Sequence, residues 1–221
     1  MTRRPRETVT TYPIATRSFK VKTADFAAPP STSGSFEDFW NGLPKILAAE
    51  SLRKVAAAIH AAKGKGKPVV LAFGAHVLKT GLGPVLIDLV ERGFVTALAT
   101  NGASGIHDFE VAFHGRTSED VGAVLETGEF GMSRETGEGI FRALRAGRKK
   151  GVGYGRALGE AILGGRLPYR HLSLFAAAAK ADVPLTVHVA LGTDTLVQHP
   201  GMDGALVGEM SIRDFTTIRR V

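Results

Sequence analysis

The stretch that decides the fold is LAFGAHVLKTGLGPVLIDLVERGFVTALATNGASGIHDFE, residues 71–110. Runs of apolar residues predict a strand over 69–73, which leads into a turn at Gly74, and a second strand over 95–99. Between these strands, residues 80–91 have the apolar spacing of a helix. A strand–helix–strand unit places the ends of both strands on one edge, where open α/β sheets bind their ligands.

The rest of the chain continues this alternation. The segment VPLTVHV at 183–189 predicts a third short strand, and a last helix is predicted from Gly204 to Val221. Further helices are predicted before the third strand, near 133–147, 153–163 and 170–181. We therefore predict an α/β fold with three parallel strands and helices on both faces of the sheet. Because no strand follows the last helix, we expect the domain to be incomplete at its C-terminus.

The start of the chain differs in composition from the rest. Residues 1–34 are rich in Thr, Pro, Ser and Arg without a sustained period, which predicts a basic arm that is poorly ordered or contacts another subunit. Ser35 and Asp38 then form the pattern of a helix capping box, and apolar residues recur at helical spacing as far as Ile59. We therefore place the arm at 1–34 and the α/β domain at 35–221.

The bulk composition excludes several classes of protein. A chain of 221 residues with 44% apolar and 22% charged residues suits a soluble α/β domain. The absence of cysteine excludes disulfides and thiolate metal sites. No apolar run reaches the roughly 18–20 residues of a spanning helix, and no hydrophobic segment follows the basic start. We therefore expect a cytoplasmic protein with no membrane partner.

The net charge of +7 could indicate a protein that binds nucleic acid, so the distribution of this charge along the chain matters. Residues 1–34 contain six Arg or Lys and two acids, a net +4 that belongs to the arm. Most of the remainder lies in RALRAGRKK at 142–150, where cations suit the end of a helix. No aromatic residues are interleaved with these charges, so we predict no nucleic-acid partner.

Two turns at the predicted ligand edge permit both a functional and a structural interpretation. Gly74, His76 and Lys79 lie at a strand-to-helix turn, where free N–H groups favour a phosphate, although ordinary turn chemistry explains them more simply. In the run 101–105 the small side chains would let a ligand approach the backbone. Alternatively, Asn101 is simply the cap of the next helix.

The polar residues His107, Asp108 and Glu110 follow this run. A histidine beside a carboxylate can transfer protons, orient an amine or bind a metal. On a helix Asp108 and Glu110 point away from each other, so the three cannot all serve one site. A metal-dependent hydrolase would need further ligands from later segments: His188, Asp194 and His199. Their spacing matches no metal-ligand signature, so we predict no metal.

The segment 191–209, LGTDTLVQHPGMDGALVGE, follows the third predicted strand and carries Asp194, Asp203 and Glu209. Helix capping explains Asp203, but it does not explain the length of the loop. We expect three segments to converge on one cleft at the carboxyl ends of the strands: 74–81, 101–108 and 191–209.

Three short segments resemble the deoxyhypusine synthase family. AHVLKTGL at 75–82 is similar to the family's Ser-Asn-Leu-Ile-Ser-Ser-Gly-Leu, and NGASGIHD at 101–108 to its Thr-Ala-Gly-Gly-Val-Glu-Glu-Asp. DGALVGEM at 203–210 is similar to Asp-Gly-Ser-Leu-Gly-Asp-Met, with one extra residue. The resemblance covers about residues 68–110 and 183–215.

This resemblance implies a Rossmann-like, NAD-binding domain of a homotetramer that transfers an aminobutyl group from spermidine to a lysine or amine acceptor. By the same resemblance, NAD would be lined by Ala75, His76, Val77, Leu78, Lys79, Asn101, Gly102, Ala103, Asp108 and Asp203. The polyamine would face His107, Asp108 and Glu209, since carboxylates suit a polycation.

The chain also departs from the family. His107 replaces the first of two paired glutamates, and the Gly-Gly-Gly-Val-Val-Lys-His-His segment and the Ser-Trp-Gly-Lys catalytic lysine are missing. Neither Lys79 nor Lys180 suits the role of nucleophile, so the catalytic residues stay unknown and no transfer by this chain alone is expected. The alternatives are a non-catalytic nucleotide- or polyamine-binding protein and the metal-dependent hydrolase.

Overall fold

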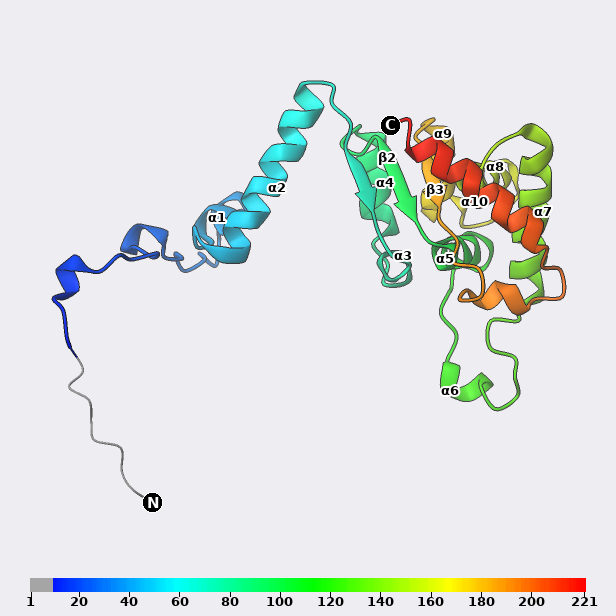
Figure 1. Cartoon of the computed structure of the whole chain (residues 1–221), viewed down its shortest axis with the longest axis horizontal. Coiled ribbons are helices and arrows are strands. Elements are labelled where there is room, and N and C mark those ends of the chain that lie inside the picture. The colour runs from blue at the N-terminus through cyan, green and yellow to red at the C-terminus, as the bar shows by residue number, and fades with distance from the viewer. Residues whose placement is uncertain (1–9) are drawn as a thin grey trace, which may run out of the picture. The chain divides into compact units, whose positions relative to one another are not determined.

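The computed structural model describes residues 10–221 (Figure 1), and these divide into two compact units. The first unit ends at Ala58 and the second comprises Ile59–Val221. The sequence places a boundary near residue 34 instead. Part of the predicted arm, residues 1–9, lies outside the described residues.

The first unit consists of short helical segments. In chain order they are the 3-10 turns η1 (Ile14–Thr16) and η2 (Thr23–Asp25), the helix α1 (Phe36–Gly42) and the beginning of α2 (Leu47–Gly64). The predicted capping box at Ser35 is confirmed, because Asp38 N donates to Ser35 Oγ at 3.1 Å and Ser35 N donates to Asp38 Oδ2 at 2.7 Å. The guanidinium of Arg53 donates to the carbonyl oxygens that follow α1, which ties α2 to α1.

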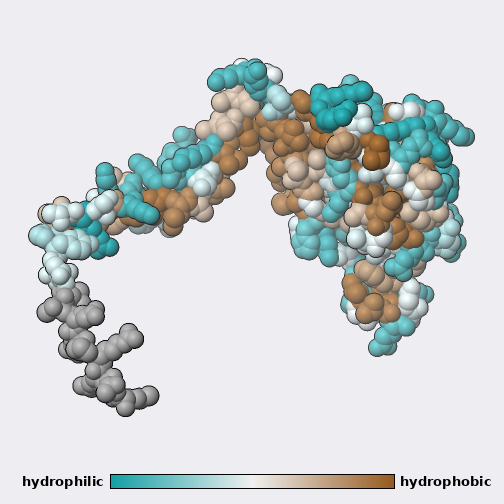
Figure 2. All heavy atoms as spheres, viewed as in Figure 1, coloured by the Kyte–Doolittle hydropathy of each residue, from teal (hydrophilic) through white to brown (hydrophobic). Residues whose placement is uncertain are grey.

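Helices α1 and α2 contain no buried residue. Instead they expose large apolar side chains, which Figure 2 shows as brown surface along this part of the chain: Phe36, Phe39, Leu47, Leu52 and Val55. Exposed apolar surface of this kind is typical of a contact with another surface. The expected homo-oligomer remains a prediction.

The second unit is built on three parallel strands, as predicted. Strands β1 (Val70–Ala72), β2 (Ala97–Thr100) and β3 (Leu185–Val187) pair in the order β1-β2-β3. Leu98 of β2 lies opposite Leu71 on one side and Leu185 on the other. The predicted α/β class is therefore confirmed, although each strand is shorter than the sequence indicates.

Helices flank this sheet (Figure 1). They are α3 (His76–Lys79), α4 (Gly83–Glu91), α5 (Gly102–His114), α6 (Val121–Val124), α7 (Arg134–Lys150), α8 (Tyr154–Gly164), α9 (Leu174–Lys180) and α10 (Gly204–Ile218), with 3-10 turns η3 (Arg170–Leu172) and η4 (Thr195–Gln198). The core between them includes fully buried Leu98, Phe141, Leu158, Phe175 and Met210. Within residues 10–221 no helix has the length and apolarity to cross a bilayer.

The helix predicted over 80–91 begins later in the structure. It is α4, over 83–91, and a separate short helix, α3, covers 76–79 in the predicted turn. Gly81 between them has φ 89°, in the left-handed region that glycine adopts most readily. Pro84 then lies in the first turn of α4, where its missing N–H costs nothing.

Helix α10 closes the outer edge of β3. Val187 N donates to Asp214 Oδ2 at 2.7 Å, and Val189 N donates to Ser211 Oγ at 3.0 Å. Ser211 Oγ in turn donates to Val187 O at 3.3 Å. Buried backbone groups need such partners, so two side chains of α10 do here what a fourth strand does in a larger sheet.

Asp214 also holds the start of α8. Gly153 at the N-cap of α8 has no side chain, and Gly155 N donates to Asp214 Oδ2 at 2.9 Å in its place. The helix can approach the strand because residue 155 is glycine: an added Cβ would lie 1.8 Å from Leu185 O. The contact between α8 and β3 therefore depends on a missing side chain.

This contact gives a stability prediction. Gly155→Ala should lower the free energy of unfolding by about 2 kcal/mol or more, because backbone atoms must move to admit the methyl group. Gly164→Ala, in the same helix, meets nothing within 4 Å and should be neutral or slightly stabilising. Urea unfolding of both variants measures the difference, and equal stabilities would contradict this packing.

Candidate functional site

All three strands end at the same edge of the sheet. Phe73 N donates to Ala99 O at 3.0 Å, and His188 N donates to Thr100 O at 2.7 Å, so the ladder continues just past β1 and β3. The chain then leaves the sheet at Gly74, Asn101 and Val189. This carboxyl edge is where α/β sheets bind ligands.

The run of small residues after β2 forms the first turn of helix α5. Asn101 caps the helix by accepting from Ser104 N at 3.2 Å, so the structural alternative for Asn101 is confirmed. Thr100 Oγ1 lies 2.5 Å from Ser104 Oγ and donates to Phe73 O at 2.8 Å. These bonds fix the start of α5 against the ends of β1 and β2.

A carboxylate from the later loop lies against the start of α5. A Cβ added to Gly102 would lie 2.0 Å from Asp194 Oδ2, so only glycine leaves room for this side chain. Burial raises the pKa of the half-buried Asp194 carboxyl. The structure thus brings together two of the predicted segments, 101–108 and 191–209.

The residues of α3 follow β1 at the same edge. Ala75 is the N-cap and makes no side-chain capping bond. Leu78 is buried and Val77 packs against the core, so these two expected cofactor residues contribute their side chains to packing. His76 and Lys79 are not part of this core.

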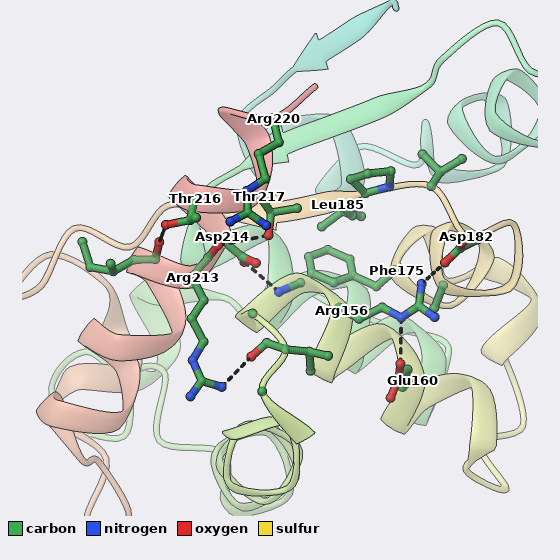
Figure 3. A pocket seen from close by; sticks show the side chains of 18 residues that line it. Arg156, Glu160, Phe175, Asp182, Leu185, Arg213, Asp214, Thr216, Thr217 and Arg220 are labelled. Atoms are coloured by element: carbon green, nitrogen blue, oxygen red, sulfur yellow. Dashed lines mark hydrogen bonds and ion pairs between the residues drawn. The ribbon is translucent and has the colours of Figure 1, made fainter. Parts of the chain in front are cut away.

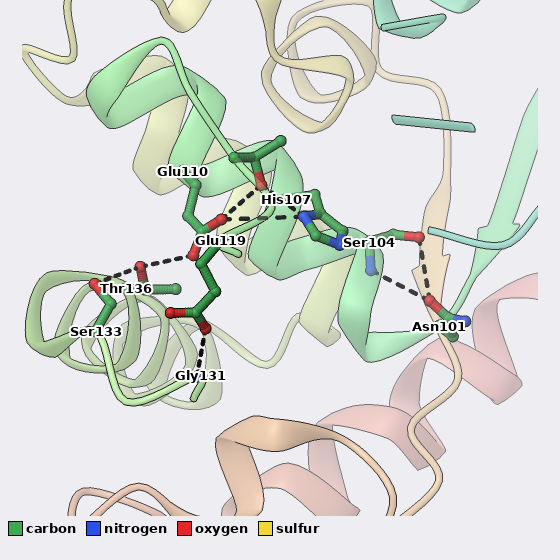
Figure 4. A network of polar contacts seen from close by, with 9 residues as sticks. Asn101, Ser104, His107, Glu110, Glu119, Gly131, Ser133 and Thr136 are labelled. Carbon is green, nitrogen blue, oxygen red and sulfur yellow. Dashed lines mark hydrogen bonds and ion pairs between the residues drawn. The ribbon is translucent and has the colours of Figure 1, made fainter. Parts of the chain in front are cut away.

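His107 on α5 belongs to a network of polar side chains (Figure 4). His107 Nδ1 lies 2.6 Å from Thr117 Oγ1, and the Thr117 hydroxyl donates to Glu110 Oε2 at 2.6 Å. The other oxygen of Glu110 accepts from Thr136 Oγ1 at 3.3 Å. The i,i+3 spacing of His107 and Glu110 places both on one face of α5.

Burial is the main cause that lowers the pKa of His107. The charge of Glu110 opposes this shift, whereas Lys79 and His76 on α3 add to it. The imidazole is therefore predominantly uncharged at neutral pH, with a carboxylate on one side and the start of α3 on another.

Asp108 lies on another face of α5. Leu174 N donates to Asp108 Oδ1 at 2.8 Å, and Ser173 Oγ donates to Oδ2. The carboxylate expected to bind NAD and a polyamine thus holds α5 to the start of α9. As the spacing indicates, Asp108 and Glu110 do not meet in one site.

Two other expected site residues have structural partners on α10. Asp203 caps this helix by accepting from Leu206 N at 3.0 Å, as the sequence indicates. Glu209 pairs with Arg148 Nε at 2.8 Å and also accepts from Arg213. These bonds explain both acids without a ligand.

The ligands of the hydrolase alternative do not come together. His188 Nε2 lies 3.0 Å from Thr186 Oγ1, whereas His199 is buried beside the ring of Phe141. Among residues 10–221 no group of three or more His, Cys, Asp or Glu side chains could hold a metal ion.

A second candidate site is a cavity of about 540 Å³ beside the amino end of β3 (Figure 3). It is lined by the starts of α8 and β3 and by the last turns of α10. Arg156 on one wall pairs with Glu160 and Asp182, each at 2.7 Å. The charge of Arg156 is therefore met by these two acids, and the cavity lies at the opposite end of the strand from the usual ligand edge.

The sequence interpretation missed Asp214 and the role of Thr117. Asp214 had a visible signal, since Leu206, Val207, Met210 and Asp214 recur at helical spacing and all four are buried. An acid on the apolar face of a helix indicates a buried hydrogen-bond acceptor. Thr117 gave no such signal, because its partners lie seven and ten positions earlier in the chain.

Comparison with known proteins identifies the fold. A family profile described as arginine dihydrolase ArgZ-like, C-terminal, Rossmann fold matches residues 53–148, less than half of the chain. With the parallel sheet of β1, β2 and β3, this makes the second unit a Rossmann-fold domain. Such a fold is compatible with an NAD(P)-type cofactor.

One curated relative and two solved structures resemble parts of the chain. An ornithine cyclodeaminase of Methanothermobacter thermautotrophicus is 29% identical over 79 residues, which are 36% of this chain and 18% of that protein. The apo structure of ArgZ, an arginine dihydrolase from the ornithine-ammonia cycle in cyanobacteria, has 22% identity and a TM-score of 0.45 over 76% of this chain and 22% of that one. A putative LOR/SDH protein of Methanococcus maripaludis S2 has 16% identity and a TM-score of 0.45 over 92% and 52%.

These findings correct the family resemblance. The profile and the curated relative point to ArgZ-like and ornithine cyclodeaminase-like proteins, so the assignment to the deoxyhypusine synthase family is wrong. The expected transfer of an aminobutyl group from spermidine, which rested on this assignment, is therefore wrong as well. Two of the three segments behind the assignment, 101–108 and 203–210, begin helices α5 and α10. Glycine-rich helix starts of this kind recur among α/β folds and do not define a family.

The buried Asp108 gives a prediction on pH dependence. Burial raises its pKa from 3.8 to about 7, so the folded protein binds the proton more tightly than the unfolded chain does. This contribution to stability is complete below pH 3.8 and is lost as the pH rises through 7.

Asp108→Asn removes the titrating proton and keeps an acceptor for Leu174 N. Between pH 5 and 7 the unfolding free energy of the wild type should fall relative to the variant by on the order of 2 kcal/mol, since one pKa unit corresponds to about 1.4 kcal/mol. Urea titrations at both pH values measure this. Parallel pH profiles would show that burial of Asp108 does not govern its ionisation.

Proposed function

We propose that the second unit binds a nicotinamide dinucleotide, NAD or NADP, at the carboxyl edge of its sheet. The observation that carries the proposal is the meeting of three strand ends with the glycine-started helix α5 in a Rossmann-fold domain. The residues expected to line the cofactor from α3 and α5 lie at this edge. Asp108, which holds α5 to the start of α9, and Asp203, which caps α10, are not part of the proposed cofactor site.

The local geometry supports an anionic ligand at this edge. The backbone N–H groups at the start of a helix favour negative charge, and α5 begins at the end of the central strand. At Gly74 an added Cβ would meet nothing within 4 Å, so the turn after β1 borders open space.

We further propose that the substrate of the whole protein is ornithine or a related amino acid. The support is the alignment with the ornithine cyclodeaminase, which is limited to 79 residues. This chain covers 18% of that relative, so the amino-acid chemistry is a proposal about the whole protein. A cytoplasmic location and a homo-oligomer joined through the apolar side chains of α1 and α2 complete the proposal.

Calorimetry with NAD+ and NADP+ tests the cofactor proposal. Gly102→Ala should weaken dinucleotide binding by at least about tenfold, or about 1.4 kcal/mol, because the methyl group displaces Asp194 and fills the edge. Gly164→Ala makes the same chemical change where nothing lies within 4 Å, and should bind as the wild type does. Circular dichroism checks that both variants fold.

Absence of heat with either dinucleotide at millimolar concentration would reject the proposal. Binding that is equal in the two variants would place the dinucleotide elsewhere in the molecule.

A further inference from the structure

The hydrogen-bond directions around His107 fix which ring nitrogen carries the proton. The single hydroxyl proton of Thr117 goes to Glu110 Oε2 at 2.6 Å. The 2.6 Å bond between His107 Nδ1 and Thr117 Oγ1 therefore needs the imidazole as its donor. A neutral imidazole has one N–H, so Nδ1 holds the proton and Nε2 keeps a free lone pair.

The free nitrogen lies toward the ligand edge. Side chains of a helix tilt toward its N-terminus, and His107 follows Ser104 by one turn on α5. In Figure 4 the ring nitrogen nearer Ser104 points away from Glu110. Within the described part of the chain, His107 Nε2 makes no hydrogen bond. No polar side-chain atom there is both buried and without a partner, so Nε2 is accessible to solvent.

The charged surroundings suit a proton acceptor. Burial, Lys79 and His76 keep the imidazole uncharged, as a base must be before it takes a proton. Glu110 Oε2 lies 4.0 Å from Nδ1 and would stabilise the positive charge once the proton arrives. Thr117 between them holds the ring in the productive tautomer.

We propose that His107 Nε2 accepts a proton from a hydroxyl or ammonium group of the ligand bound at the carboxyl edge. In this step the ligand's O–H bond, or one N–H bond of its ammonium group, breaks, and the electron pair stays on the oxygen or on the nitrogen of the resulting neutral amine. The proton bonds to Nε2, while Nδ1–H still donates to Thr117 Oγ1 and the new charge faces Glu110. The inference rests on the proposed function, and the hydroxyl or ammonium group belongs either to the dinucleotide or to an amino-acid substrate.

A purely structural network predicts a different behaviour. Thr117 and Thr136 also tie the segment after α5 to the start of α7 through Glu110. That structural role requires the hydrogen bonds to Glu110, but it does not require Nε2 to be unprotonated or to contact a ligand. The state of Nε2, with and without ligand, therefore separates the two roles.

The experiment is nitrogen NMR of the full chain labelled with ¹⁵N-histidine, at pH 7.5. The wild type should show His107 with its proton on Nδ1, and Thr117→Ser, which keeps the hydroxyl, should match it. Thr117→Val should shift the proton toward Nε2, because Nδ1 loses its acceptor. A wild-type proton on Nε2, or a Ser variant that behaves like the Val variant, overturns the inference.

The same samples are then titrated with NAD+, and afterwards with L-ornithine in the presence of NAD+. The Nε2 resonance should move toward its protonated value in one of these arms, and the arm identifies the source of the donor group. Calorimetric binding of NAD+ with Nε2 unmoved in both arms overturns the inference and leaves the proposed function standing. No NAD+ binding rejects the proposed function, and the inference then fails as well unless the addition of L-ornithine moves the Nε2 resonance.

Discussion

The outer edge of β3 sets the constraint on which the rest of the domain depends. A strand buried between helices cannot leave its N–H and C=O groups unpaired. Asp214 accepts from Val187 of the strand and from Gly155 of α8, so one oxygen joins three elements. Burial raises the pKa of this carboxyl to about 7, which is the energetic cost of placing it there.

This arrangement also positions the ligand edge. Because α10 is bonded to β3 through Asp214 and Ser211, both ends of the segment between them are fixed. The segment then returns over the start of α5, where Asp194 lies against Gly102. On the other side, Thr100 and Ser104 hold α5 to the end of β1. His107 thus lies one helical turn after the start of α5, and hydrogen bonds to the sheet fix both α5 and the segment that follows β3.

The sequence predicts the parts of this fold that follow from local pattern. The capping box at Ser35 and the caps Asn101 and Asp203 rest on residues within a few positions of one another, and each of the three strands is a short local run of apolar residues. The short helix α3 was not predicted, and α4 begins at Gly83 instead of residue 80, although Gly81 and Pro84 carried a signal for this later start.

The remainder depends on contacts between distant residues. Asp214 meets a glycine 59 positions away, and Asp108 meets Leu174 66 positions away, so spacing says nothing about either bond. The candidate site shares this difficulty, because His107 is visible in the sequence but the hydroxyl that sets its tautomer is not. The family assignment failed for a related reason: short glycine-rich helix starts report local geometry, which many Rossmann-fold domains share.

In the proposed function, the carboxyl edge of the sheet binds the dinucleotide and the cavity beside the amino end of β3 does not. Backbone amide NMR of the whole chain during titration with NAD+ tests it most directly. We expect shift changes in residues 74–79, 101–107 and 191–195, with residues 151–156 and 212–217 unchanged. Changes confined to the second group of residues would contradict it.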